Sequence, residues 1–216
     1  GNANVNFPLT NKLLKKEINK DHKLYILGGF ISSTINNEIT TLGRGGSDYT
    51  ASILAAALHA AELQIWTDVR GVLTADPNLV EKAFPIETLS YEEAMELSHF
   101  GAKVIYPPTI QPVLNQKITI KIKDTFNPLA KGTIISADSS SGENPITGIS
   151  SMNDMALITV RGSGMIGVMG MAQRIFGTLA KNNININLIS QASSEHSISI
   201  ALKPKQAEKA KIAFDE

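Results

Sequence analysis

A lone arginine stands among three glycines in the segment TLGRGGSD, residues 41–48, and these residue types together are suited to holding an anion. The glycines around Arg44 permit left-handed backbone and close approach of a ligand. The guanidinium of Arg44 offers forked donors that fit a carboxylate or a phosphate. Ser47 or Asp48 can cap the alanine-rich helix that follows, whose first amides favour a negative group. The segment predicts either an anion site or an ordinary strand-to-helix turn with Arg44 in solvent.

A second glycine-rich loop, residues 162–167, has the spacing Gly-x-Gly-x-x-Gly between a predicted strand and a predicted helix. This is the local form of a dinucleotide fingerprint, which also requires a parallel second strand that ends in an acidic residue. The strand here ends at Ser190 and Gln191, and the chain then returns at once as an antiparallel hairpin. We therefore expect the loop to hold a small ligand or to pack against a neighbouring subunit, and not to bind a nicotinamide cofactor.

Strands and helices alternate through the first part of the chain, and this order must position the arginine loop. Hydrophobic periodicity and turn residues predict helices at 10–20, 48–61, 90–101 and 107–115, the third with a capping box from Ser90 to Glu93. They predict strands at 23–30, 39–42, 63–66 and 118–122. Such alternation indicates an α/β unit with a largely parallel sheet and helices on both of its faces.

The composition changes near residue 135, where small and polar residues run without apolar periodicity. We expect a first domain at 1–135, a linker at 136–145 and a second domain at 146–216. In the second domain the predicted elements are strand 155–160, helix 168–181, strands 184–190 and 196–202, and a helix after Pro204. This β-α-β-β-α order is the ferredoxin-like α+β pattern, here expected to be incomplete because a fourth strand is missing.

Composition excludes several classes of function. The chain has 216 residues, of which 43% are hydrophobic and 19% charged, as in a globular protein. The formal net charge is zero, so nothing predicts binding to nucleic acid or to an anionic membrane. The chain has no cysteine, which excludes disulfides and thiolate metal sites. We find neither a signal-peptide pattern nor an apolar run long enough for a bilayer, and expect a cytoplasmic protein.

Four long motifs follow one another along the chain: TLGRGGSDYTA, IWTDVRGVLTADP, SYEEAMELSHFGAKVIYPPTI and NPLAKGTII. Their order and spacing are typical of aspartate kinases, and from about Leu24 onward the chain resembles that family. The later segment VGMAQRIFGTLAKNNININLISQASSEHSISIAL resembles the ACT regulatory domain of the same enzymes. Its LISQASSEHSISIAL part is most similar to the bifunctional aspartokinase/homoserine dehydrogenases. The resemblance implies an amino-acid-kinase-type sheet followed by an ACT domain.

The resemblance also implies a reaction, the transfer of the γ-phosphoryl group of ATP, with Mg²⁺, to the β-carboxylate of aspartate. Arg44 would bind the α-carboxylate of aspartate, and Asp48 would position the ammonium group of the substrate or order the loop. The positions that correspond to the family's nucleotide contacts are Thr67, Asp68, Leu73, Asn78, Lys103 and Val104. Phosphoryl transfer of this kind depends mostly on positioning and on neutralisation of phosphate charge.

The chain departs from the family at four places. Leu73 stands where the family often has tyrosine, and Asn78 stands where arginine is usual, so adenine packing and phosphate neutralisation are expected to differ. Tyr106 replaces a common histidine with no clear consequence. The lysine-glycine-glycine segment that holds the ATP phosphates in the family does not occur in residues 1–20. We therefore expect a fragment that is itself inactive as a kinase.

In the ACT-like part, resemblance places an amino-acid effector between the loop before the first helix and the following strand. The candidate residues are Gly164, Met165, Asn185, Asn187 and Gln191. Period-two alternation predicts Asn185 and Asn187 on one face of the strand, and neutral amides suit threonine better than lysine. In the other interpretation these amides only form hydrogen bonds with backbone groups at a sheet edge and in a turn. The unpaired sheet edge predicts a homo-oligomer through the ACT domains, and a stand-alone amino-acid sensor on a non-catalytic α/β scaffold is the alternative function.

Overall fold

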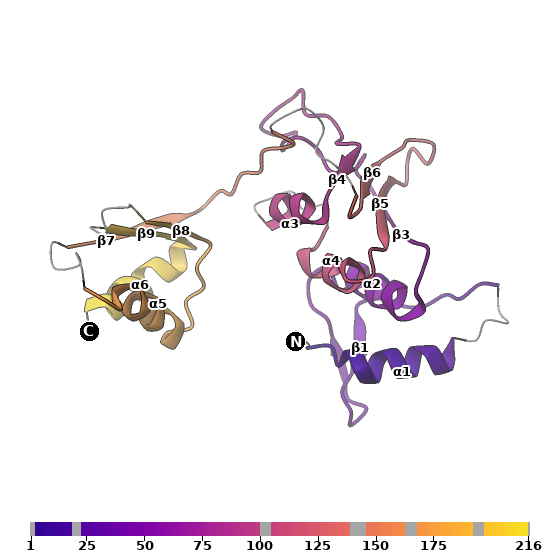
Figure 1. Ribbon diagram of the computed structural model, residues 1–216, viewed down its shortest axis with the longest axis horizontal. Coiled ribbons are helices and arrows are strands. Elements are labelled where there is room, and N and C mark those ends of the chain that lie inside the picture. The colour runs from indigo at the N-terminus through magenta and orange to yellow at the C-terminus, as the bar shows by residue number, and fades with distance from the viewer. Residues whose placement is uncertain are drawn as a thin grey trace. The chain divides into compact units, whose positions relative to one another are not determined.

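The computed structural model describes residues 3–18, 23–99, 105–138, 146–162, 168–191 and 197–215. The chain divides into two compact units, Gly1–Ser151 and Met152–Glu216, which are described separately (Figure 1). Most of the predicted linker lies outside the described residues, so the domain limits of 1–135 and 146–216 stay predictions. By its contacts, the segment 146–151 belongs to the first unit.

The N-terminal part of unit 1 contains one helix and one hairpin. Helix α1 (Phe7–Glu17) begins where the side chain of Asn6 accepts a hydrogen bond of 3.2 Å from Leu9 N, three residues earlier than the sequence predicts. Strands β1 (Ile31–Ser33) and β2 (Ile39–Thr41) pair in antiparallel fashion.

The strand predicted at 23–30 is wrong, because the structure has no strand there. Leu24 and Ile26 are 77% and 90% exposed. An apolar run becomes a strand only when a neighbouring strand accepts its backbone hydrogen bonds. Among the described strands, no registered pair includes a residue of this segment.

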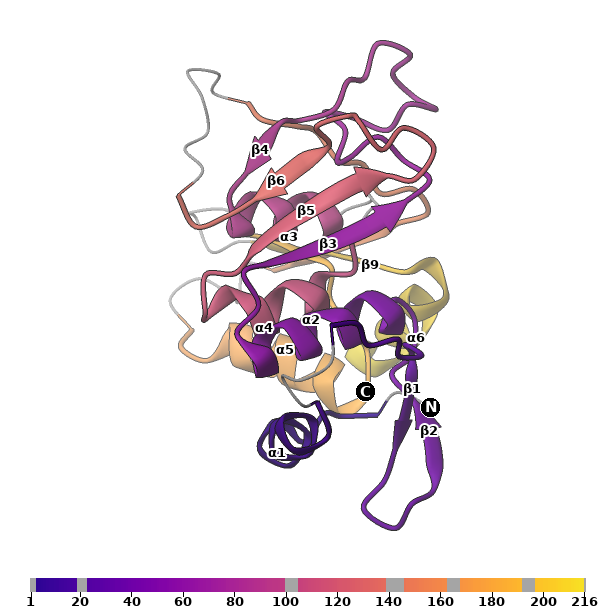
Figure 2. The same ribbon diagram turned by 90° about the vertical axis from the view of Figure 1, so that its right-hand side faces the viewer.

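The main sheet of unit 1 has the order β3-β5-β6-β4 (Figure 2). Strands β3 (Glu62–Thr67) and β5 (Thr119–Asp124) are parallel, and so are β4 (Thr88–Leu89) and β6 (Thr133–Ile135). The pair β5 and β6 is antiparallel, because one short connection reverses the chain between them. The α/β class is confirmed, and the sheet is mixed where a largely parallel one was predicted.

The two faces of β3 and β5 differ in chemistry. Alternate residues such as Leu63, Ile65 and Ile120 are buried in a core shared with residues from the helices α2, α3 and α4. The residues between them form a polar array. In it Lys121 Nζ and Glu62 Oε2 form an ion pair at 2.5 Å, Gln64 donates to Glu62, Trp66 Nε1 donates to Gln64 Oε1 at 3.0 Å, and Lys123 Nζ lies 5.5 Å from the Trp66 ring centroid.

Four helical segments cover this core. Helix α2 (Gly46–Leu58) begins after Gly45, whose φ of 70° is left-handed, and it has no side-chain cap bond. The predicted cap by Ser47 or Asp48 is therefore wrong, because both residues already lie inside the first turn. The remaining segments are α3 (Tyr91–His99), the 3₁₀ turn η1 (Pro107–Thr109) and α4 (Ile110–Leu114).

The capping box of α3 is confirmed. The Ser90 N–H donates to Glu93 Oε2 at 2.8 Å, and the Glu93 N–H donates to Ser90 Oγ at 3.1 Å. This reciprocal pair satisfies backbone donors at the start of the helix.

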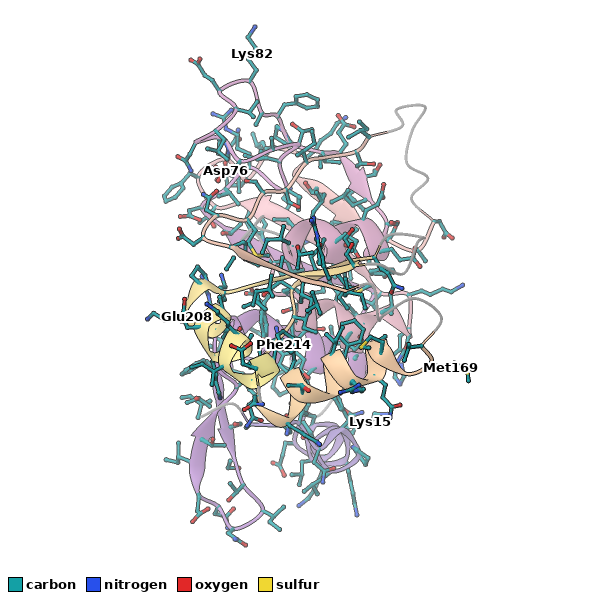
Figure 3. The ribbon with its side chains drawn as sticks, turned by 90° about the vertical axis from the view of Figure 1, so that its left-hand side faces the viewer. Lys15, Asp76, Lys82, Met169, Glu208 and Phe214 are labelled. Carbon is teal, nitrogen blue, oxygen red and sulfur yellow. The ribbon has the colours of Figure 1, made fainter. Side chains whose placement is uncertain are left out.

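Unit 2 has the predicted β-α-β-β-α order. Its elements are β7 (Ala156–Arg161), α5 (Met171–Lys181), β8 (Leu188–Gln191), β9 (Ser197–Leu202) and α6 (Pro204–Asp215). The sheet order is β7-β9-β8 with both pairings antiparallel, and α5 and α6 pack on one of its faces (Figure 1). Phe214 of α6 packs against the core, whereas Met169, just before α5, points into solvent (Figure 3).

The strand predicted at 184–190 begins only at Leu188. Asn185 and Asn187 therefore precede the strand, and the period-two argument that placed them on one strand face does not apply. No helix in the described ranges of the chain has the length and apolar character needed to cross a membrane.

Candidate functional site

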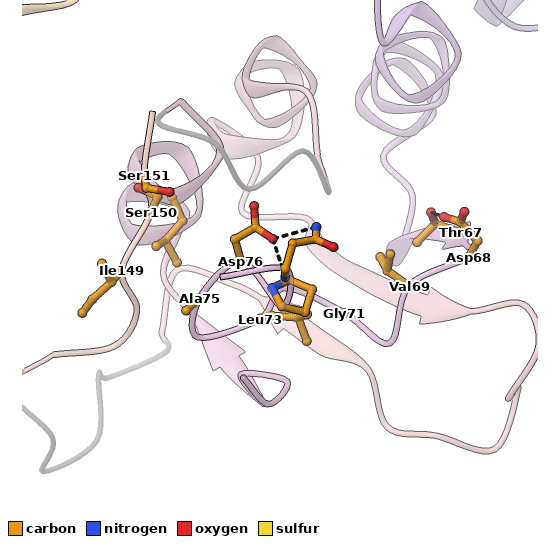
Figure 4. Close-up of a pocket in the computed structure, with 13 residues that line it drawn as sticks. Thr67, Asp68, Val69, Gly71, Leu73, Ala75, Asp76, Ile149, Ser150 and Ser151 are labelled. Carbon is orange, nitrogen blue, oxygen red and sulfur yellow. Dashed lines mark hydrogen bonds between the residues drawn. The ribbon is translucent and has the colours of Figure 1, made fainter. Parts of the chain in front are cut away.

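A cavity of about 370 Å³ opens in unit 1 where β3 ends (Figure 4). Strand β3 is parallel to β5, and Thr67 at its end is in register with Asp124. The carboxyl ends of parallel strands are the usual ligand-binding edge of α/β sheets. The lining residues are Thr67, Asp68, Val69, Gly71, Leu73, Ala75, Asp76, Pro77, Asn78, Leu97, Ile149, Ser150 and Ser151.

A hydroxyl group on β6 fixes the shape of the loop after β3. Thr133, which is buried on β6, accepts a hydrogen bond from Val72 N at 2.9 Å and donates one to Ile86 O at 2.7 Å. A methyl group on Gly71, which has φ of 133°, would lie 2.5 Å from Thr133 Oγ1. The shape of the loop that lines the cavity therefore depends on the hydroxyl group of Thr133, which is 61 residues from Val72 in the sequence.

The cavity brings together four residues that sequence resemblance assigned to the nucleotide: Thr67, Asp68, Leu73 and Asn78. The Thr67 hydroxyl donates to Asp68 Oδ1 at 3.1 Å. The backbone N–H and the side-chain Nδ2 of Asn78 donate to Asp76 Oδ1 at 2.8 and 2.9 Å (Figure 4). Asn78 stands where the resemblance leads us to expect an arginine, and its side-chain amide already donates a hydrogen bond to the carboxylate of Asp76.

The sequence did not assign the rest of the lining to the nucleotide. Asp76-Pro77 is a turn signal, which does not reveal that a cavity lies beside it. Leu97 follows the helical pattern of α3. Residues 149–151 match no motif, and only tertiary structure brings them to the cavity. Lys103 and Val104 lie outside the described residues.

A second region of interest lies at the first turn of α2. Arg44 is exposed there, and neither Arg44 nor Asp48 lines the cavity described above. The segment 28–30 closes over this turn. Phe30 N donates to Thr50 Oγ1 at 3.1 Å, and a methyl group on Gly29 would lie 3.0 Å from Ser47 Cα.

The arginine loop is packed tightly from another side as well. A methyl group on Gly45 would clash with Cβ and the ring of Tyr106. Tyr106, whose identity had no consequence at the level of sequence, is thus the side chain that covers the loop. Gly45 is obligatory here for two reasons, its left-handed φ of 70° and this contact.

The electrostatics of the α2 start disfavour an isolated negative charge. Burial raises the pKa of Asp48, and a hydrogen bond with Ser47 offsets part of that rise. Burial and the neighbouring Tyr106 raise the pKa of Tyr49. A cationic ligand group beside Asp48 would favour its ionised form, as an ammonium group does for a carboxylate.

The residues predicted for the effector site in unit 2 are only partly described. Gly164 and Met165 lie outside the described residues. Asn187 N donates to Ala201 O at 2.9 Å, which extends the pairing of β8 with β9 by one residue. Asn185 and Gln191 are exposed, and Gln191 is the last residue of β8. Within the described part of the chain, no group of three or more His, Asp or Glu side chains could hold a metal ion.

Residues 1–124 match the model of the amino acid kinase family, which is more than half of the chain. The chain belongs to the amino acid kinase family. Residues 158–216 match an ACT domain model. The recognition made from sequence motifs is thus confirmed for both parts.

Curated relatives of this family member are aspartokinases. The bifunctional aspartokinase/homoserine dehydrogenase of Haemophilus influenzae is 46% identical over 206 residues, which are 95% of this chain and 25% of that protein. The chloroplastic bifunctional aspartokinase/homoserine dehydrogenase 2 of Arabidopsis thaliana is 46% identical over 85% of this chain and 21% of its own length. The chain therefore spans a quarter or less of these two relatives.

Solved aspartokinases share the fold. Aspartokinase III of E. coli in complex with aspartate and ADP is 36% identical, with a TM-score of 0.65 over 81% of this chain and 38% of that chain. The same enzyme in complex with lysine and aspartate is 34% identical, with a TM-score of 0.66 over 94% of this chain and 45% of that chain. The predicted fold class, an amino acid kinase sheet followed by an ACT domain, is confirmed.

Proposed function

We propose that this chain is part of an aspartate kinase, which transfers the γ-phosphoryl group of ATP to the β-carboxylate of aspartate. The observation that carries the proposal is the cavity at the end of β3, which collects Thr67, Asp68, Leu73 and Asn78 in one place. The sequence motifs assign the same four residues to the nucleotide, independently of the cavity. A similar protein, E. coli aspartokinase III, holds aspartate and ADP.

The lining suits a nucleotide in its chemistry. Leu73 and Leu97 supply apolar surface on which a purine base can pack, and Thr67 supplies a hydroxyl group. The carboxylates of Asp68 and Asp76 are the hard oxygen ligands that Mg²⁺ accepts together with phosphate oxygens. A bound Mg²⁺ would neutralise phosphate charge during the transfer. The chain's own residues would orient the nucleotide and exclude water around its base.

Aspartate is proposed to bind at the first turn of α2. The exposed guanidinium of Arg44 would pair with the α-carboxylate of the substrate, and Asp48 would accept hydrogen bonds from its ammonium group. The raised pKa of Asp48 fits this role, because the ammonium group would supply the positive charge that the carboxylate lacks.

Substitution of Arg44 tests the proposal in the protein expressed at the full length of its gene. The Arg44→Ala variant should raise KM for aspartate by roughly 10- to 100-fold, the range for a lost charge-assisted pair, and change KM for ATP less than about twofold. Aspartyl phosphate is trapped with hydroxylamine for the measurement. Arg174→Ala, an exposed arginine on α5, is the matched control. An unchanged KM for aspartate removes Arg44 from the site, and absence of aspartyl phosphate with the unaltered protein overturns the function.

Unit 2 is proposed as the regulatory part, with threonine as its ligand. Gln191 is exposed at the end of β8, where a neutral amide can donate to and accept from a hydroxyl or ammonium group. Gln191→Ala should relieve inhibition by threonine at least about fivefold, the amount expected for one lost hydrogen bond, with uninhibited turnover unchanged. Inhibition by lysine in place of threonine would contradict the assignment, since lysine is bound by the similar E. coli aspartokinase III.

Unit 2 is also proposed to mediate self-association. In the described sheet, β7 and β8 each pair only with β9, so each has a free backbone edge. Such an edge is a template for a strand of another chain. Light scattering at micromolar concentration should give a dimer or a larger assembly, and a monomer would contradict the proposal.

A further inference from the structure

The last residues of unit 1 form a strap, defined as residues 147–151, that crosses α3 and ends in the cavity. At its start the Thr147 hydroxyl donates to Glu93 Oε1 at 2.7 Å. In its middle the Ile149 N–H donates to Thr74 O at 2.8 Å. Its last three residues line the cavity, opposite the Thr67 side (Figure 4). None of these contacts is between neighbours in sequence, so the strap is a tertiary feature.

The carboxylate of Glu93 anchors the strap to α3. Its Oε2 accepts the capping-box hydrogen bond from Ser90 N, and its Oε1 accepts from Thr147. Burial would raise the pKa of Glu93, but these hydrogen bonds outweigh it and the pKa is lowered. The group that fixes the start of α3 is therefore the same charged group that holds the strap.

Close packing holds the strap one residue further on. A methyl group on Gly148 would lie 3.1 Å from Cδ2 of Leu97 and 3.3 Å from Thr74 O. Leu97 itself lines the cavity. The strap thus rests on α3 and on the loop after β3, and a shift of the strap would change the cavity directly.

We propose that the strap is a wall of the nucleotide site, with Thr147 and Glu93 as the positioning residues that hold it in place. This inference rests on the proposed function, since it takes the cavity to be the nucleotide site. Ser150 and Ser151 supply hydroxyl groups for the oxygens of the ribose or the phosphates, and Ile149 supplies apolar surface. Met152, the next residue, begins unit 2. The regulatory unit is therefore joined to the nucleotide site by the chain itself.

The test is the affinity for ADP of the protein expressed at the full length of its gene, measured by calorimetry. Thr147→Val removes the donor to Glu93 and keeps the size of the side chain. The Kd for ADP should rise about five- to tenfold, as for one lost hydrogen bond of ordinary strength. KM for ATP should rise with it, and kcat at saturating ATP should stay near the original value. Thr147→Ser keeps the hydroxyl group and should retain the original Kd.

Thr34→Val is the matched control, because Thr34 Oγ1 also donates to a glutamate, Glu38 Oε2 at 3.4 Å, but in the β1–β2 hairpin and not in the lining of the cavity. It should leave the Kd for ADP unchanged. If Thr147→Val fails to fold, the double variant Ser150→Ala with Ser151→Ala decides, and its Kd should rise severalfold.

The outcomes separate the two proposals. Failure of the unaltered protein to bind ADP overturns the proposed function and the strap with it. ADP binding by the unaltered protein, with the same Kd in Thr147→Val or in the double serine variant, overturns the strap alone.

Discussion

Two regions of unit 1 are held together in different ways. At the first turn of α2, glycines allow the backbone to pack closely against other segments. At the cavity, hydroxyl and carboxylate groups form hydrogen bonds between segments that are far apart in the sequence. Gly45 leaves no room for a methyl group beside Tyr106. At the cavity, Thr133 bridges Val72 and Ile86, and Glu93 accepts the hydrogen bond from Thr147 that holds the strap. We therefore expect the first turn of α2 to be destabilised by added side-chain atoms, and the cavity to be destabilised by the loss of polar groups.

The largest expected effect is that of Gly45→Ala. The left-handed φ of 70° costs about 1 kcal/mol for a residue with a Cβ, and overpacking against Tyr106 adds roughly 2 kcal/mol. We expect a loss of about 3 kcal/mol in the free energy of unfolding by urea, followed by circular dichroism. In a Tyr106→Ala background the cost of Gly45→Ala should fall to about 1 kcal/mol. An unchanged cost in that background would show that the close contact is not the cause.

Gly170 provides a comparison, because it has a φ of 85° and no atom of the described residues lies within 4 Å of a methyl group placed on it. Gly170→Ala should therefore cost only the left-handed term, about 1 kcal/mol. Equal costs at Gly45 and Gly170 would contradict the role of packing at α2.

An intermediate effect is expected for Thr133→Val at the cavity. The substitution keeps the volume but leaves Val72 N and Ile86 O without their partner, and an unpaired buried group costs about 1–3 kcal/mol. We expect about 2 kcal/mol of destabilisation together with weaker ADP binding. Thr133→Ser should restore both. Hydrogen exchange of the Val72 amide gives a direct readout, and unchanged protection in Thr133→Val would be the contrary result.

The smallest expected effect is on the pH dependence of stability, to which Asp48 and Glu93 should contribute with opposite sign. The pKa of Asp48 is raised from 3.8, so its stabilising neutral form is lost as pH rises through the folded-state pKa. The pKa of Glu93 is lowered from 4.5, so its contribution is present above 4.5 and is lost as pH falls through the folded-state pKa.

Unfolding by urea at a series of acidic pH values tests this pair. Relative to the unaltered chain, Asp48→Asn should become more stable as pH rises through this range, and Glu93→Gln less stable. A shift of the same sign for both variants would refute the contrast between the two regions.

Local signals were enough to predict part of the fold. The capping box from Ser90 to Glu93 and the hairpin of β8 and β9 depend on residues close in sequence, and both occur as expected. The strand at 23–30 failed because a strand requires a partner that local periodicity does not supply. Asn185 and Asn187 were placed in a strand for a similar reason, since the apolar alternation extends beyond the residues that pair.

The candidate site also contains some residues that sequence motifs predict and others that only the tertiary structure brings there. Motif order predicted that Thr67, Asp68, Leu73 and Asn78 act together, and one cavity contains them. Residues 149–151 could not be predicted, because their place depends on hydrogen bonds to Glu93 and Thr74 that no sequence pattern encodes.

The polar array on β3 also provides an optical reporter. Trp66 is the single tryptophan of the chain, is 47% exposed and directly precedes Thr67 at the edge of the cavity. Its indole is held by Gln64 and lies beneath Lys123, so its emission depends on the water and charge around one defined position. Because unit 2 contains no tryptophan, intrinsic tryptophan fluorescence of this chain arises from unit 1 alone. Titration of nucleotide can therefore be followed without a label, at the strand that ends in the cavity.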